Sequence, residues 1–305
     1  MESNYHFTVM KQEAIQNLQI KTNGIYIDAT LGMGGHTEEI SKTKKNIKKI
    51  ICIDNDHSSI ELAKIRLKDS KCKIEFICAN FKNIDQVIKE KVDGVILDLG
   101  ISTYQLSNSK RGFSFKSGNK LDMRINLSQK LTANEIVNSY SVKEISDLLK
   151  NYGEEKNHFK IASEIARYRS KKEISTSEEL TGIISKINKN SSNIDPSTRT
   201  FQALRIAVNN ELGAIEEFLK KSEKILNKGA RLIIITFHSL EDRIVKKFFK
   251  SSEAECICPP TQLICDCNKK PTLKIITKKP IRPTKEEIVL NPSSRSAKMR
   301  VGEVI

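Results

Sequence analysis

Short apolar runs recur in the first hundred residues and again near residue 230. They cover residues 25–27, 49–53, 74–78, 92–97 and 231–237. The runs are rich in β-branched residues, and most lead into an acidic or polar position, a pattern typical of strands buried in a parallel sheet. It predicts an α/β protein with a doubly wound, Rossmann-like sheet, whose ligands bind beyond the carboxyl ends of the strands.

From residue 101 to about residue 211 the pattern becomes helical. Ser141 and Glu144 predict a capping box before apolar positions three or four residues apart, and Gly153 suits the C′ position of that helix. Ser175 and Glu178 predict a second capping box further along the chain. The middle of the chain is therefore expected to be helical throughout.

Residues 156–170 continue the helical period, with Phe159 among the apolar positions. The whole pattern predicts a discontinuous α/β domain formed by residues 1–106 and 212–305. A helical domain of residues 107–211 is inserted between the two parts.

Beyond the insert, a predicted helix runs to Gly229 and is followed by the strand at 231–237. Ser239 and Asp242 then suit the N-terminal cap of another helix. His238 either bonds to this loop or lines a substrate pocket, and Arg243 either pairs with an acid or binds a phosphate.

A turn with three glycines, Gly32, Gly34 and Gly35, follows the first predicted strand. Glycine has no Cβ, so the backbone can take positive φ values and lie close against a ligand. The spacing is G-x-G-G, whereas dinucleotide sites use G-x-G-x-x-G. Asp28 precedes the turn, and its charge disfavours a pyrophosphate but suits the cationic amino group of S-adenosylmethionine. An ordinary tight turn is the alternative at this point.

The residues that follow the next strands favour the cofactor interpretation. Asp54 ends the second predicted strand, where doubly wound sheets place an acid on the ribose hydroxyls. Phe81 follows the third strand and offers an aromatic ring to an adenine, and Asp98 ends the fourth strand. Carboxyl ends of parallel strands meet at one edge of the sheet, so these side chains are expected to form one site with the glycine turn.

The composition adds a polyanionic partner to this picture. The chain has 305 residues and a formal net charge of +15, which suggests nucleic acid, although drift toward a lysine-rich composition is the alternative. Residues 269–300 carry two acids, Glu286 and Glu287, and ten basic residues: Lys269, Lys270, Lys274, Lys278, Lys279, Arg282, Lys285, Arg295, Lys298 and Arg300. Pro280 and Pro283 are expected to hold part of this segment extended along a phosphate backbone.

The chain begins without a charged and apolar leader and has no apolar run near twenty residues, so we expect a cytoplasmic protein without a membrane span. Its seven cysteines should be reduced. Cys52, Cys72 and Cys78 lie in or beside predicted strands and are expected in the core.

Two C-x-C pairs, Cys256 with Cys258 and Cys265 with Cys267, flank a Pro-Pro turn. Together they could bring four thiolates around one zinc ion. Zinc sites more often use C-x-x-C, so no metal-binding residue is assigned from the sequence and the zinc question stays open.

Several longer segments resemble the bacterial 16S rRNA cytosine-N4 methyltransferase family, also called RsmH or MraW. They occur in the family's order and cover most of the chain: residues 28–36 (DATLGMGGH), 98–102 (DLGIS), 111–115 (RGFSF), 121–124 (LDMR), 201–206 (FQALRI), 237–243 (FHSLEDR) and 291–297 (NPSSRSA). One departure is Thr103-Tyr104, where the family usually has Ser-Pro before the glutamine that is Gln105 here.

This resemblance implies a class I methyltransferase that transfers a methyl group from S-adenosylmethionine to N4 of a cytidine in small-subunit rRNA. It places Gly34, Gly35 and His36 on the methionine part of the cofactor and Asp54 on the ribose. Phe81 and Asp98 would lie on the adenine side, and Gln105 at the pocket edge. The helical insert is expected to take part in RNA recognition.

Neither the resemblance nor the residues identify a catalytic base, and Asp98 is only a candidate. The oligomeric state is also open. Two other classes of function compete with the enzyme: an RNA-binding protein on a methyltransferase fold without catalysis, and an NAD-dependent oxidoreductase. The intact glycine turn and Asp54 disfavour the first, and the glycine spacing and the basic segment disfavour the second.

Overall fold

The computed structural model describes residues 7–43, 45–101, 111–114, 118–188, 195–259, 262 and 264–305. The chain forms two compact units. One consists of Met1–Gly100 together with Leu212–Ile305, and the other of Ile101–Glu211. Among the described residues, no helix has the length and apolar character needed to cross a membrane.

The first unit is built on a seven-stranded sheet with the order β3-β2-β1-β4-β5-β7-β6. Its strands are β1 (Ile25–Asp28), β2 (Lys49–Asp54), β3 (Ile74–Cys78), β4 (Val92–Asp98), β5 (Leu226–Thr236), β6 (Leu273–Ile275) and β7 (Lys298–Val304). Strands β1 to β5 pair in parallel, whereas β7 is antiparallel to both β5 and β6. The predicted doubly wound class I methyltransferase fold is confirmed.

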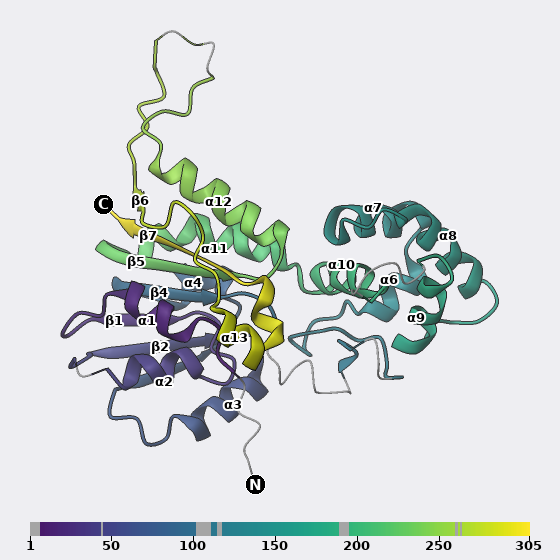
Figure 1. Cartoon of the computed structure of the whole chain (residues 1–305), viewed down its shortest axis with the longest axis horizontal. Helices are drawn as coiled ribbons and strands as arrows, with labels where there is room; N and C mark the ends of the chain where they lie inside the picture. The colour runs from purple at the N-terminus through teal and green to yellow at the C-terminus, as the bar shows by residue number, and fades with distance from the viewer. Residues whose placement is uncertain are drawn as a thin grey trace. The chain divides into compact units, whose positions relative to one another are not determined.

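Helices cover both faces of this sheet (Figure 1) because the central strands are apolar on both sides. In β1, Ile25 and Ile27 belong to one core and Tyr26 to the other. The helices of this unit are α1 (Lys11–Leu18), α2 (Gly35–Ser41), α3 (His57–Arg66), α4 (Ile84–Val87), α11 (Glu211–Ile225), α12 (Ser239–Glu253) and α13 (Lys285–Leu290), with 3-10 turns η1 (Phe81–Asn83) and η3 (Pro292–Ser296). Residues of α1, α2 and α3 pack into the core that contains Tyr26, and residues of α11 and α12 into the other.

The second unit is helical, and its core is separate from those of the sheet. It contains α6 (Ala133–Ser139), α7 (Val142–Gly153), α8 (His158–Arg169), α9 (Ser177–Ser185) and α10 (Thr198–Asn209). Ser141 and Glu144 form the predicted capping box of α7. Phe159, expected among the apolar core positions of α8, is instead 62% exposed, because Ile161, Ala162 and Ile165 supply the buried face.

The second capping box lies one residue later than the sequence pattern suggested. Thr176, rather than Ser175, has the extended backbone of an N-cap, and its hydroxyl accepts a hydrogen bond from the Glu179 N–H. The Glu179 carboxylate in turn accepts hydrogen bonds from the N–H groups of Thr176 and Ser175. The β-branched hydroxyl side chain therefore caps α9.

Gly153 does not occupy the C′ position predicted for it. It is the last residue of α7, and Glu154 takes the left-handed conformation, with φ of 49°. A Cβ on Gly153 would lie 2.7 Å from the Arg199 carbonyl oxygen of α10. The glycine is therefore needed for the close packing of α7 on α10.

Replacing Gly153 by alanine should destabilise the helical unit by about 1–3 kcal/mol, since the new methyl group meets backbone that cannot move away cheaply. Gly182 in α9 offers a matched control, because no atom lies within 4 Å of a Cβ built there. Gly182→Ala should be neutral or stabilising by up to ~1 kcal/mol. Urea unfolding of the two variants measures the difference, and equal midpoints would contradict this packing argument.

One expectation for the C-terminal third is wrong. The helix before β5 ends at Ile225, and Gly229 lies inside β5 with φ of +74°, where the pairing with β4 is irregular. In the basic segment, the part between Pro280 and Pro283 is extended, because Ile281 forms an antiparallel bridge with Met299, whereas α13 forms further along. Lys298 and Arg300 both pair with Asp242, at 3.2 and 2.7 Å.

Candidate active site

In the glycine turn between β1 and α2, each of the three glycines meets a backbone or packing requirement that a larger residue would not meet. Gly32 and Gly34 have positive φ values of 50° and 80°. Gly35 begins α2, and a Cβ there would lie 1.7 Å from Oγ1 of Thr8, which is itself buried. Side chains at these positions would disturb the turn, so its close packing at the carboxyl edge of the sheet depends on glycine.

Asp54 ends β2 and holds this turn in place. One carboxylate oxygen accepts a hydrogen bond from the Gly32 N–H and the other from the Asp56 N–H, both at 2.8 Å. Burial raises the pKa of Asp54 to about 6, although both hydrogen bonds oppose the rise. Each carboxylate oxygen can accept a further bond, so Asp54 can bind a ligand hydroxyl while it anchors the turn.

His36 lies between the ends of β1 and β4, close to Asp28 and Asp98. Its Nε2 is 3.4 Å from an oxygen of Asp98. Burial lowers the pKa of His36. The contact with Asp98 and the charge of Asp28 raise this pKa by more than burial lowers it, so the net pKa lies above its usual value. Burial also raises the pKa of Asp28, against the effects of His36 and Thr37.

This acidic cluster, defined by Asp28, His36 and Asp98, contains polar atoms that have no hydrogen-bond partner among the described residues. They are one oxygen of each aspartate and both ring nitrogens of His36. Buried polar atoms normally find partners, because an unsatisfied group costs free energy. The cluster therefore suits a polar ligand that presents a cationic amino group, and the carboxylates would bind that group.

Phe81 lies where the sequence predicted it, directly after β3 in η1. Its ring packs edge to face on Phe218 of α11, with the centroids 5.8 Å apart and the planes at 86°. The Asn80 side chain caps the turn by accepting from the Lys82 N–H at 3.0 Å. These contacts fix a partly exposed ring at the same sheet edge as Asp54.

Gln105, Thr103 and Tyr104 lie outside the described residues. Of the site residues expected from the sequence, the structure brings Gly34, Gly35, His36 and Asp98 together around the turn that Asp54 anchors. Phe81 lies two strands away from β1, beyond β2.

Sequence reasoning missed three contributors to the site. The Thr37 hydroxyl donates to Asp28 at 2.7 Å, and the Asp98 N–H donates to the Thr30 hydroxyl at 2.7 Å. Glu287 of α13 accepts a bond from the Met10 N–H at 2.9 Å, and burial raises its pKa, as does the charge of Asp98. Thr30 and Thr37 sit next to predicted residues and could have been found, whereas nothing local indicates Glu287.

His238 caps α12, in place of the predicted Ser239 and Asp242. Its ring accepts weakly from the Glu241 N–H at 3.5 Å, and Glu241 accepts in return from the His238 N–H at 3.2 Å. Glu241 also accepts from Phe237 at 2.7 Å. Of the two alternatives for His238, the bond to the loop is therefore present, while Asp242 pairs with Lys298 and Arg300 of β7.

Of the three cysteines expected in the core, Cys52 is buried, Cys72 is half-buried and Cys78 is exposed. Cys78 differs because β3 is an edge strand without a fully buried residue, and Cys78 is its last position. Partial burial raises the pKa of Cys78, and the charges of Asp54 and Asp56 add to this rise. The thiol therefore stays protonated and is a poor nucleophile near neutral pH.

The strand order, the glycine turn and the acids at the carboxyl edge define a class I methyltransferase. The model of the MraW methylase family matches residues 3–305, and the chain belongs to that family.

Relatives named "Ribosomal RNA small subunit methyltransferase H" are similar to this chain over nearly its whole length. The protein of that name from Clostridium botulinum (strain Kyoto / Type A2) is 50% identical over 302 residues, which cover 97% of each chain. The Clostridioides difficile (strain 630) protein is 44% identical and covers 99% of each chain. The one from Caldicellulosiruptor saccharolyticus is 46% identical over 98% of this chain and 99% of its own.

Proposed function

We propose that this protein transfers a methyl group from S-adenosylmethionine to the exocyclic N4 of a cytidine in the decoding region of 16S rRNA. Family membership and the names of the relatives support a small-subunit rRNA substrate. The observation that carries the proposal is the acidic cluster beside the glycine turn, with its buried, unpaired oxygen atoms.

The strand order matches the order of groups in the cofactor. Phe81 follows β3 and would bind the adenine, and Asp54 at the end of β2 would bind the ribose. The methionine part would then reach Gly34, Gly35 and His36, between β1 and β4. Because Asp98 lies 3.4 Å from His36, we place Asp98 at the methionine end instead of the adenine side, with Gln105 left at the pocket edge.

When bound, S-adenosylmethionine supplies an electrophilic methyl group on its sulfonium. The residues of this chain would bind and orient the cofactor, exclude water and accept a proton from the amine, for which Asp98 is the candidate acceptor. Orientation alone can lower a barrier by roughly 7–11 kcal/mol. The target base must also leave its stack to reach such a pocket.

Methyl transfer to an exocyclic amine agrees with the properties of the cysteines near the site. Methylation at carbon 5 of cytosine requires a thiolate that adds to the ring. Cys52 is buried and its pKa is raised by that burial and by the charge of Asp28, and the pKa of Cys78 is raised as well. N4 methylation needs no covalent step, so alignment and proton removal are sufficient.

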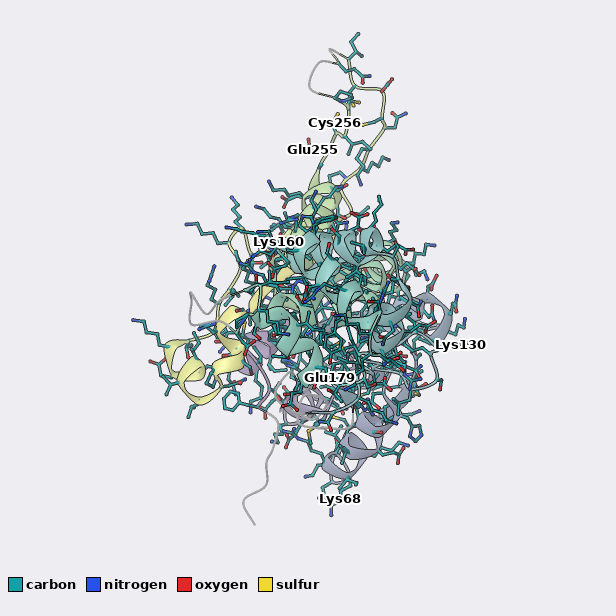
Figure 2. All side chains as sticks on the ribbon, turned by 90° about the vertical axis from the view of Figure 1, so that its right-hand side faces the viewer. Lys68, Lys130, Lys160, Glu179, Glu255 and Cys256 are labelled. Carbon is teal, nitrogen blue, oxygen red and sulfur yellow. The ribbon has the colours of Figure 1, made fainter. Side chains whose placement is uncertain are left out.

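We infer that the helical unit contributes to RNA recognition. Phe159 is 62% exposed on α8, and its sequence neighbours Lys156 and Lys160 are exposed. Figure 2 labels Lys160, which belongs to α8. An exposed aromatic ring between lysines suits an unpaired base and its phosphates, because bases stack on aromatic rings and lysine binds phosphate.

The reaction product tests the proposal. Small subunits from a strain that lacks this gene should accept one methyl group from tritiated S-adenosylmethionine, and nucleoside mass spectrometry should identify N4-methylcytidine. Finding 5-methylcytidine, a methyladenosine or a ribose methyl group would overturn the N4 assignment. Cofactor binding without transfer to mature or precursor subunits would favour a non-catalytic RNA-binding protein.

Replacing Asp54 by alanine should weaken S-adenosylmethionine binding at least tenfold. The variant loses a charged hydrogen-bond acceptor for the ribose and the anchor of Gly32, and a hydrogen bond to a charged group contributes roughly 1.5–3 kcal/mol, where 1.4 kcal/mol is tenfold. Calorimetric titration measures the dissociation constant, and circular dichroism checks the fold. Asp69→Ala, at an exposed loop position, is the control, and an unchanged constant for Asp54→Ala would remove Asp54 from the site.

A further inference from the structure

The segment between α12 and β6 projects away from the sheet (Figures 1 and 2), and Figure 2 labels Glu255 and Cys256 on it. None of its described residues from 255 to 268 is buried. Even its isoleucines face solvent, with Ile257 62% exposed and Ile264 81% exposed. The described residues of this cysteine hairpin, residues 256–267, therefore form no buried apolar core that holds its two halves together.

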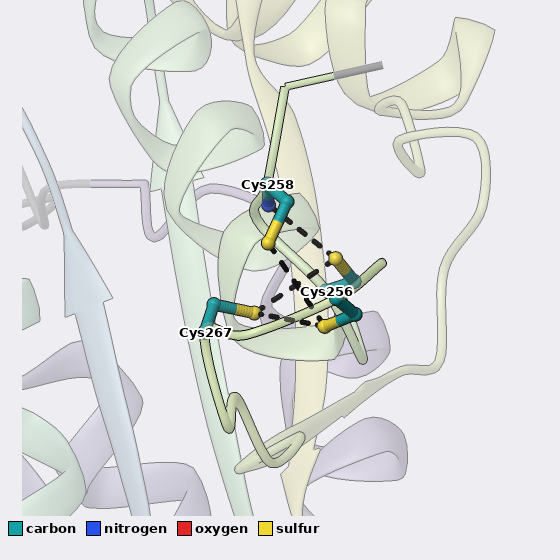
Figure 3. Close-up of side chains that lie close together, drawn as sticks. Cys256, Cys258 and Cys267 are labelled. Atoms are coloured by element: carbon teal, nitrogen blue, oxygen red, sulfur yellow. Dashed lines mark hydrogen bonds between the residues drawn. The ribbon is translucent and has the colours of Figure 1, made fainter. Parts of the chain in front are cut away.

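Four cysteine sulfurs nevertheless converge in the hairpin, two from each half (Figure 3). The Sγ atoms of Cys256, Cys258, Cys265 and Cys267 all lie within 4.8 Å of one another. Three of the separations are 3.9 Å for Cys258 to Cys265, 3.5 Å for Cys265 to Cys267 and 3.8 Å for Cys267 to Cys256. A disulfide needs about 2.05 Å, so these sulfurs are not bonded to each other.

The separations fit one tetrahedral metal ion. Zinc binds thiolate sulfur at about 2.3 Å, and the edge of a tetrahedron with that radius is about 3.8 Å. Contact among four thiols at a solvent-exposed site is not stabilised by burial of apolar surface. A central cation would stabilise it, since the cation attracts all four thiolates.

We propose that the cysteine hairpin binds one structural zinc ion through Cys256, Cys258, Cys265 and Cys267. Four thiolates in a tetrahedron select zinc or iron among common metals. The short sulfur–sulfur separations exclude an iron–sulfur cluster, in which the four thiolates bind several iron atoms and lie further apart. All four ligand positions come from the protein, so no position is open for substrate. The ion holds the hairpin and takes no part in methyl transfer.

The backbone supports this assignment despite the C-x-C spacing. The Cys258 N–H lies 3.3 Å from the Cys256 sulfur and donates to it, which stabilises a thiolate. The Cys258 thiol donates to an oxygen of Asp266 at 3.5 Å. Cys258 would lose this proton on binding zinc as a thiolate, and the hydrogen bond to Asp266 would then be absent. The ion would supply the cohesion that packing among the hairpin's described side chains does not provide.

Metal analysis of the full-length protein, purified without a histidine tag or chelator, tests the site. Mass spectrometry of the metal content should find one zinc per chain, and Cys265→Ser should lose it. Cys72→Ser removes a thiol from the first unit outside the hairpin and should retain the zinc. Cobalt added to the metal-free protein should give the strong visible bands of a tetrahedral thiolate site.

Fold and cofactor binding are checked in the same samples by circular dichroism and S-adenosylmethionine titration. Cys265→Ser should lose zinc while its circular dichroism and its S-adenosylmethionine affinity stay unchanged. Thiol titration of native protein should show the four hairpin thiols protected until a chelator is added. Four reactive thiols in zinc-saturated buffer, a disulfide between any two of them, or iron in place of zinc would overturn the proposal.

Discussion

Replacing Asp98 by asparagine should lower kcat/KM for methyl transfer about 100-fold. Asp98 has a buried oxygen without a partner, and its other oxygen lies 3.4 Å from His36. Asparagine keeps the shape but removes the charge that would bind the cofactor's amino group. A hydrogen bond to a charged group contributes roughly 1.5–3 kcal/mol, and the upper value corresponds to about 100-fold.

Two measurements separate the roles that Asp98 can have. If it binds the amino group, calorimetry should show weaker S-adenosylmethionine binding. If it also accepts the proton, kcat should fall further under saturating cofactor. Asp93→Asn is the matched control, because Asp93 is at the other end of β4 and bonds to Ile25 and Asn227. Transfer by Asp98→Asn at the wild-type rate would exclude Asp98 from the reaction.

The same variant should lower the pKa of His36. In the native protein Asp98 raises this pKa against the effect of burial, so without that charge burial has the larger influence. A raised histidine pKa stabilises the folded state below the pKa of an unfolded histidine, and this stability is lost as the pH rises through the folded pKa. Titration of the imidazole by nuclear magnetic resonance measures the change directly.

The sheet could be predicted from sequence because its strands are short apolar runs that end in acids. Asp28, Asp54 and Asp98 each mark the last residue of a strand, so parallel pairing alone brings them to one edge. Gly34 and Gly35 were visible for a similar reason, because closely spaced glycines have few uses other than tight backbone conformations. Local pattern and topology are sufficient for this part of the site.

Contacts that depend on distant packing could not be predicted. Glu287 of α13 lies 277 positions after Met10 in the sequence, and no residue near either one signals their contact. Phe159 has the right helical period for a core position, yet three neighbouring apolar residues already fill the buried face. The convergence of Cys256 and Cys267 likewise depends on how the hairpin closes, which the spacing of each pair does not specify.

Reversing the charges of Lys278, Lys279 and Arg282 should weaken binding to small-subunit rRNA by on the order of 100-fold at low salt. Topology places these residues at the cofactor edge of the sheet, because Ile281 pairs with Met299 near the start of antiparallel β7. All three are exposed, and none forms an ion pair within the part of the chain that the structure describes. Their charges are therefore available to phosphates.

The salt dependence of binding tells local contact from overall charge. Each lost phosphate contact lowers the slope of log affinity against log salt by about 0.9, so the triple variant should lose about three. Its control reverses Lys68, Lys71 and Lys73, which are exposed beside the amino end of β3, at the opposite edge of the sheet (Figure 2 labels Lys68). Both variants change the net charge equally and should bind S-adenosylmethionine normally. Equal slopes for the two triple variants would mean that the basic segment attracts RNA only through the protein's net charge. The segment would then not lie along the RNA backbone.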